Sequence, residues 1–171
     1  MNRICAWCKK EMANREQYSA DGDITHGICS LCAVEFTRNI TRTAQEILDM
    51  IVEPVFVLDS EGVVKSTNAS GRKLLGKEYS DISNHLGGEV FECVYARLPE
   101  GCGRTEHCKT CAIRNTVMDT LATGRSYTKV PAFQKINTPG GVRIMRFFVS
   151  TEKLDGHILL RIDEATAKAT V

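Results

Sequence analysis

The sequence predicts an α+β fold, in which a small metal-binding module and a helix precede two strands, several short helices and three further strands. Three observations lead to this prediction. The eight cysteines fall into two tight groups of four, separated by a long cysteine-free stretch. Apolar residues then recur at helical spacing up to Ile51. Beyond Pro54 the apolar residues form short runs bounded by turn residues, which is typical of strands.

The first cysteine group predicts a structural zinc site within residues 1–36. Two C-x2-C turns each aim two thiolates at one point, and together they complete a tetrahedron. So short a segment buries little apolar surface, and a bound metal supplies the missing stability. We expect Trp7 to shield the metal and His26 to be an outer residue instead of a ligand. The four expected ligands are Cys5, Cys8, Cys29 and Cys32.

An amphipathic helix is predicted over residues 40–51, within a linker or dimerisation segment that spans residues 37–53. Its apolar face is made by Ile40, Ala44, Ile47, Leu48 and Ile51. Thr41 or Thr43 is suited to cap its start, and Pro54 prevents its continuation.

The remaining elements alternate between strand and helix patterns. Asn68 is suited to cap a short helix over 69–75 that Gly76 closes, and Gly124 to close a helix over 112–122. Short helical stretches are expected near 79–85 and 88–93. The predicted strands span 55–59, 63–67, 126–136, 142–150 and 157–163.

This order of elements, opened by Ile51-Val-Glu-Pro-Val-Phe-Val-Leu-Asp59 and Gly62-Val-Val-Lys-Ser-Thr-Asn68, resembles a PAS domain over roughly residues 42–165. The resemblance implies a five-stranded antiparallel sheet with helices on one face, here assigned to residues 54–171. It also implies sensing without catalysis, and a ligand pocket between the helices and the sheet. Residues 5–32 resemble a zinc-ribbon-like segment found beside bacterial sensor domains. Residues 101–114 resemble a cysteine-bearing PAS variant often joined to histidine kinases.

The second cysteine group is less regular, and four interpretations remain open. An iron–sulfur cluster such as 4Fe–4S tolerates irregular spacing, and some four-cysteine PAS domains hold one, although with a different spacing. A second structural zinc is the next alternative. The others are a thiol–disulfide switch at Cys108 and Cys111, and free core cysteines. His107 stays a possible additional ligand, and Ala112 stands where c-type haem attachment needs histidine. The expected ligands are Cys93, Cys102, Cys108 and Cys111.

Composition excludes several functional classes. The net charge is +1, which argues against nucleic acid or an anionic membrane as partner. The start has no secretory signal, and no apolar run is long enough to cross a bilayer, so a cytoplasmic protein with reduced thiols is expected. No P-loop, nucleophile elbow or useful carboxylate pair is present, so we expect no enzyme.

The function expected from these observations is a cytosolic sensory module, homodimeric through the 40–51 helix. It would act on a signalling partner such as a histidine kinase or regulator, in trans or as a piece of a larger protein. Two alternatives stay open: an adaptor stabilised by two zinc ions, and a small thiol-redox or electron-transfer protein.

Overall fold

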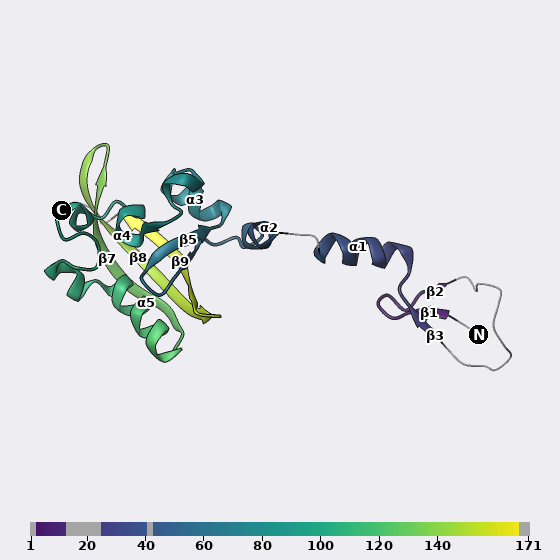
Figure 1. The fold of residues 1–171 in the computed structure, drawn as a ribbon. Coiled ribbons are helices and arrows are strands. Elements are labelled where there is room, and N and C mark those ends of the chain that lie inside the picture. The colour runs from purple at the N-terminus through teal and green to yellow at the C-terminus, as the bar shows by residue number, and fades with distance from the viewer. Residues whose placement is uncertain (1–2, 13–24, 41–42, 168–171) are drawn as a thin grey trace. The chain divides into compact units, whose positions relative to one another are not determined.

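The computed structural model describes residues 3–12, 25–40 and 43–167 and divides the chain into two compact units, 1–43 and 44–171 (Figure 1). None of the helices in the described ranges is long and apolar enough to cross a membrane.

The first unit is a small three-stranded sheet followed by a helix. Strand β1 (Arg3–Cys5) pairs antiparallel with β2 (Glu11–Met12) and parallel with β3 (Thr25–Gly27). Helix α1 (Ser30–Ile40) begins directly after Cys29. The β1–β2 turn and the start of α1 therefore each carry two of the four cysteines.

The second unit contains one antiparallel sheet in the order β6-β5-β4-β9-β8-β7. The predicted sheet is confirmed, but it has six strands instead of five. The additional strand β6 pairs with β5 at the sheet edge through two residues, too few to show an apolar period in the sequence. The strands are β4 (Val55–Leu58), β5 (Val63–Thr67), β6 (His85–Leu86), β7 (Tyr127–Thr138), β8 (Gly141–Leu154) and β9 (His157–Ala167).

The two best-marked helices form where they were predicted. Asn68 caps α3 (Ala69–Leu75) by accepting from the Gly71 N–H, and Gly76 ends it in the left-handed conformation. Helix α5 (Ala112–Thr123) ends at Gly124 in the same way. The short helices between them are η1 (Tyr79–Asp81), α4 (Gly87–Val90), η2 (Val94–Arg97) and η3 (Glu106–Thr110).

The predicted helix over 40–51 differs from the structure. Ile40 ends α1, and the next helix, α2, spans only Ala44–Asp49. Threonines disfavour a helix interior and favour its cap, and Thr43 directly precedes α2. The apolar spacing that joined Ile40 to Ile51 therefore crosses two separate helices, and residues 41–42 lie outside the described part of the chain.

Three aromatic rings link the helices to one face of the sheet. Phe91, just after α4, packs on Phe56 of β4 at a centroid distance of 4.9 Å and on Phe147 of β8 at 5.8 Å. Gly71 of α3 approaches Phe56 from the same side, and α5 contacts β7, β8 and β9. The buried cluster also contains Val64, Val117, Val149, Ile158 and Leu160. This core supports the helices that surround the second cysteine group.

Candidate metal centres

The four cysteines of the first unit converge on one point. Their sulfur atoms all lie within 4.8 Å of one another, and the Sγ atoms of Cys8 and Cys29 are 3.8 Å apart. Tetrahedral zinc with Zn–S bonds of about 2.3 Å has sulfur atoms about 3.8 Å apart. The predicted convergence of this quartet is confirmed, and the spacing suits a single ion held by four thiolates.

Backbone donors already favour thiolate at this site. The N–H of Cys29 donates to Cys5 Sγ, and that of Cys32 to Cys29 Sγ, each at 3.4 Å. Hydrogen bonds from the Cys8 and Cys29 N–H groups lower the pKa of Cys5 to about 6. Hydrogen bonding to the sulfurs of Cys29 and Cys8 raises the pKa of Cys32 to about 12. Four thiolates repel one another at this distance, and a divalent cation removes that repulsion.

Of two further expectations at this site, one is not supported and the other is not tested. Trp7 is 69% exposed, so most of its surface faces solvent, and the structure does not support its predicted shielding of a metal. The side chain of His26 lies outside what the structure describes.

The second quartet lines a single cavity of about 720 Å³ in the second unit. Cys93 follows α4 and forms a bridge with Ile136 of β7. Cys108 lies in η3, and Cys111 is the N-cap residue of α5, as the sequence predicted. Cys102 lies in the loop between η2 and η3. Four separate segments thus direct their cysteines to one cavity.

These four cysteines are spaced more widely than the first quartet. Within the described range 43–167 they do not form a group whose sulfur atoms all lie within 4.8 Å of one another. A single zinc ion draws four sulfurs closer than that. The structure therefore does not support the alternative of a second zinc ion bound by all four thiolates in this arrangement.

Cys102 is packed tightly against α4. A Cβ built on Gly88 would lie 2.6 Å from Cys102 Sγ, closer than real Cβ atoms approach a neighbour, and 3.1 Å from the Cys102 Cβ, which is a tight contact. Burial raises the pKa of Cys102 above its ordinary value, while a hydrogen bond from the Gly88 N–H opposes the shift. Gly88 is thus the residue that lets Cys102 reach the cavity from this side.

Two hydrogen bonds involve the Cys108 sulfur. The N–H of Gly103 lies 3.1 Å from its Sγ, and the Thr105 hydroxyl lies 3.2 Å from it. Gly103 has a φ of 87°, a left-handed conformation that aims its N–H and favours glycine. Burial raises the pKa of Cys108, but these hydrogen bonds and the charge of Arg114 outweigh it, so the pKa is lowered. This sulfur is therefore prepared to carry negative charge.

At Cys111 burial outweighs the hydrogen bonds, so the pKa of the thiol is raised. Burial raises the pKa of its thiol, and the N–H groups of Arg114 and Ile113 in the first turn of α5 oppose the rise. No pair among the eight cysteines is joined in a disulfide.

An aromatic pair forms part of the cavity wall. The rings of Tyr95 and His107 stack at a centroid distance of 3.8 Å with an angle of 18° between their planes. His107 was left open as an additional ligand, and the structure places its ring against Tyr95 beside the cysteine quartet.

Sequence reasoning identified the cysteines but missed the residues that support them. Gly88, Thr105 and Arg114 lie on separate elements and belong to no motif. Only Gly88 offered a signal in the sequence, because a glycine inside a predicted short helix costs stability and so indicates a close contact at that position.

No protein-family model matches the chain, and no curated protein matches it. Solved structures that it resembles include a domain of a sensory box sensor histidine kinase/response regulator from Geobacter sulfurreducens, with 14% identity, a TM-score of 0.48, and coverage of 77% of this chain and 96% of that one. The PAS domain of nitrogen regulation protein NR(II) from Vibrio parahaemolyticus has 13% identity, a TM-score of 0.45 and coverage of 75% and 100%. The PAS domain, in complex with ethanol, of a LuxR-family transcriptional regulator from Burkholderia thailandensis has 13% identity, a TM-score of 0.44 and coverage of 71% and 96%. Two of these three structures are named as PAS domains.

Proposed function

We propose that the second unit is a sensory domain whose Cys93, Cys102, Cys108 and Cys111 bind an iron–sulfur cluster of the 4Fe–4S or a related type, and that it responds to oxygen or redox state. The observation that carries the proposal is the shared cavity: four cysteines from four segments line it, with sulfurs spaced more widely than one ion requires. A cluster holds its cysteine sulfurs farther apart than a single ion, because several irons and sulfides stand between them.

The surroundings of the cysteines favour an anionic group. Donors to Cys108 Sγ come from the Gly103 N–H and the Thr105 hydroxyl, and hydrogen bonds to cluster sulfurs tune reduction potential. Arg104 and Arg114 line the same cavity and supply positive charge. When bound, such a cluster would supply one-electron redox chemistry and sensitivity to oxygen.

The first quartet has a structural role in this proposal. Four thiolates leave no open coordination position, which argues for zinc that folds the first unit instead of catalysing a reaction. The cavity contains no evident catalytic arrangement, so we propose no enzymatic activity for the chain.

The proposed output is a change in protein–protein contacts in the cytoplasm. Helix α2 and the residues after it expose a set of large apolar side chains, which suits a homodimer or a signalling partner such as a histidine kinase or regulator. The exposed fractions are 54% for Ile47, 62% for Met50 and 82% for Val52. Nucleic acid and membrane are disfavoured by the near-neutral charge.

The experiment compares the intact 171-residue chain, purified without oxygen, before and after exposure to air. We expect a brown protein whose visible absorbance decreases in air. Its association state, dimer or monomer, as measured by sedimentation, should change at the same time. Cys102→Ala is expected to be colourless and unresponsive. A colourless wild-type protein with two zinc ions per chain would overturn the proposal in favour of a structural adaptor. A brown wild-type protein whose association state is changed neither by air nor by Cys102→Ala would refute sensing.

A further inference from the structure

Resting on the proposed cluster site, we infer that the state of Cys93 is coupled to the docking of helix α2, through Glu92, Lys77 and helix α3. Helix α2 is the first element of the second unit. It is therefore the element through which the proposed site would transmit its state.

The coupling begins with backbone strain beside Cys93. Glu92 has a φ of 55°, a left-handed conformation that costs free energy for a residue with a side chain. Such a conformation persists where its surroundings hold it in place. The Glu92 carbonyl accepts from the Asn137 N–H at 2.8 Å, and the Cys93 N–H donates to the Gly88 carbonyl at 2.7 Å. The peptide that sets the direction of Cys93 is therefore fixed on both sides.

Two cations hold the Glu92 side chain. Lys77 Nζ lies 2.5 Å from one carboxylate oxygen, and Arg97 lies 2.8 Å from the other. Lys77 Nζ also donates to the Val90 carbonyl at 2.9 Å, at the end of α4. One ammonium group thus joins the end of α4 to the strained residue before Cys93.

Lys77 is itself attached to helix α3. Its N–H donates to the Arg72 carbonyl at 3.2 Å, and the Gly76 N–H donates to the Lys73 carbonyl at 3.3 Å. This pair of bonds is the Schellman arrangement that closes a helix at its C-terminus. Because the Lys77 backbone closes α3, displacing the Lys77 side chain is expected to disturb the hydrogen bonds of the last turn of this helix.

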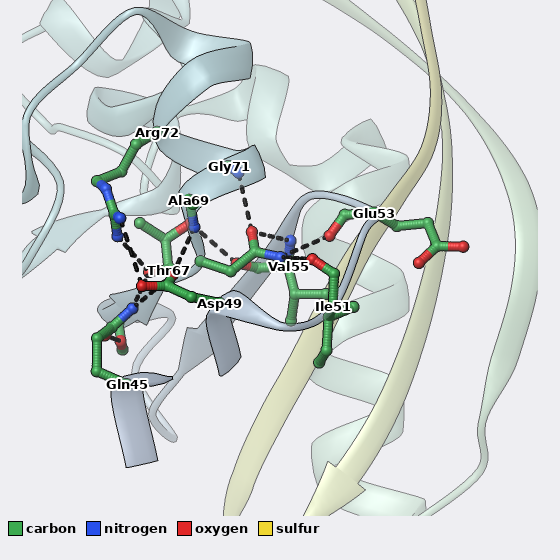
Figure 2. Close-up of polar contacts among 11 residues, drawn as sticks. Gln45, Asp49, Ile51, Glu53, Val55, Thr67, Ala69, Gly71 and Arg72 are labelled. Carbon is green, nitrogen blue, oxygen red and sulfur yellow. Dashed lines mark hydrogen bonds and ion pairs between the residues drawn. The ribbon is translucent and has the colours of Figure 1, made fainter. Parts of the chain in front are cut away.

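The other end of α3 holds helix α2 (Figure 2). Asp49 Oδ1 accepts from the Ala69 N–H at 2.6 Å, and its second oxygen pairs with Arg72 at 3.5 Å. Gln45 donates to the Thr67 carbonyl at 2.9 Å and to Asp49 at 3.0 Å. Arg72 therefore takes part at both ends, with its carbonyl on Lys77 and its guanidinium on Asp49.

These contacts form an element suited to two states. Helix α2 contributes no buried residue, and polar contacts attach it to its own domain while Ile47 and Met50 stay exposed. Docking through partly solvated polar contacts opens at a lower free energy than docking through a packed apolar core. When Cys93 is held at the site, Glu92 stays in its strained conformation and Lys77 stays paired. When Cys93 is released, Glu92 can relax, the ion pair weakens, and α2 undocks more readily.

The experiment measures hydrogen exchange at the Ala69 amide, whose donation to Asp49 reports α2 docking. It uses the intact chain with its cluster and after anaerobic removal of iron by a chelator. We expect exchange roughly five-fold or more faster without the cluster, the lower end of typical coupling strengths. Lys77→Ala is expected to abolish this difference, whereas Lys73→Ala, an exposed lysine on the same helix, keeps it.

A reciprocal measurement covers the case in which Lys77→Ala folds poorly. Coupling of binding free energies acts equally in both directions, so Asp49→Asn, which keeps an oxygen for Ala69 but loses the charge that faces Arg72, is expected to retain less iron at equilibrium with a competing chelator. Equal Ala69 exchange with and without cluster, or an unchanged equilibrium iron content in Asp49→Asn, would refute the coupling and leave the cluster proposal standing. A wild-type chain that binds no iron would instead refute the proposed function, and the coupling with it.

Discussion

Gly88 and Cys102 lie so close that a methyl group on Gly88 would sit 2.6 Å from the Cys102 sulfur. Gly88→Ala must therefore displace Cys102 from the cavity, and we expect cluster affinity to fall roughly ten- to hundred-fold, as for the loss of a supporting contact at a metal site. Iron and sulfide content after anaerobic reconstitution measures it. Gly87→Ala is the matched control, since its Cβ would approach nothing closer than the Gly62 carbonyl at 4.0 Å. Equal iron content in both variants would contradict the role assigned to Gly88.

The Thr105 hydroxyl is expected to tune the proposed cluster through Cys108. Thr105→Val removes an O–H donor 3.2 Å from the sulfur while keeping the shape of the side chain. Losing a hydrogen bond to a sulfur destabilises the more negative, reduced form, so the midpoint potential should fall by on the order of 20–60 mV. Anaerobic redox titration checks the shift. Thr105→Ser, which keeps the hydroxyl, should stay near the wild-type value, and a rise in potential for Thr105→Val would be inconsistent with this account.

Removing zinc should unfold the first unit while the second remains folded. The four sulfurs lie within 4.8 Å of one another, Cys5 is the only buried apolar residue among the described side chains of this unit, and structural zinc contributes on the order of 10–16 kcal/mol in such modules. Cys29→Ser is expected to make amides of residues 3–12 exchange freely, while those of β8 and β9 stay protected. Protection in the first unit that survives zinc removal would show that metal is not what folds it.

Asn68 is expected to be the most sensitive polar residue of the second unit. It is fully buried, and its side-chain oxygen accepts from the Val55 and Gly71 N–H groups while its nitrogen donates to the Ile51 and Glu53 carbonyls. Asn68→Ala loses the α3 cap and leaves these groups unpaired, which should cost on the order of 2–4 kcal/mol in the free energy of unfolding. Denaturant titration measures the loss. Asn68→Asp keeps the oxygen that caps α3, so it should reduce the free energy of unfolding less than Asn68→Ala does. Equal losses in the two variants would contradict a contribution from the cap and would assign the whole effect to the hydrogen bonds that the Asn68 nitrogen donates.

Asp59 should make stability depend on acid pH. Burial raises the pKa of its carboxyl, but hydrogen bonds from the Val63 and Glu61 N–H groups and the nearby Lys65 together lower it. A carboxyl with a lowered pKa in the folded state stabilises the fold above its unfolded pKa of about 3.9, and this contribution disappears as pH falls through the folded value. Thermal unfolding between pH 7 and acid conditions should therefore show a smaller acid-induced loss in Asp59→Asn than in wild type. An identical pH profile in the two proteins would argue against this role.

The sequence predicted local structure better than the arrangement of the second site. Asn68 and Gly76 act within a few residues of their own helix, so α3 could be predicted from its caps alone. The first quartet was equally predictable, because each C-x2-C turn fixes two ligands locally. Helix α1 was missed, because it carries Cys32 of the first quartet and its apolar residues Leu31 and Val34 are mostly exposed instead of forming a buried face. In the second quartet Cys108 and Cys111 are also a local C-x2-C pair, but their distances to Cys93 and Cys102 depend on loops between separate segments, and no local rule sets those distances.

Metal and sulfide analysis of the intact 171-residue chain, purified and kept without oxygen, tests the central claim most directly. The account predicts one zinc per chain that Cys29→Ala abolishes, together with iron and acid-labile sulfide in equal amounts that Cys102→Ala abolishes. A folded chain without iron, or with iron that persists when Cys102 is replaced, would contradict it.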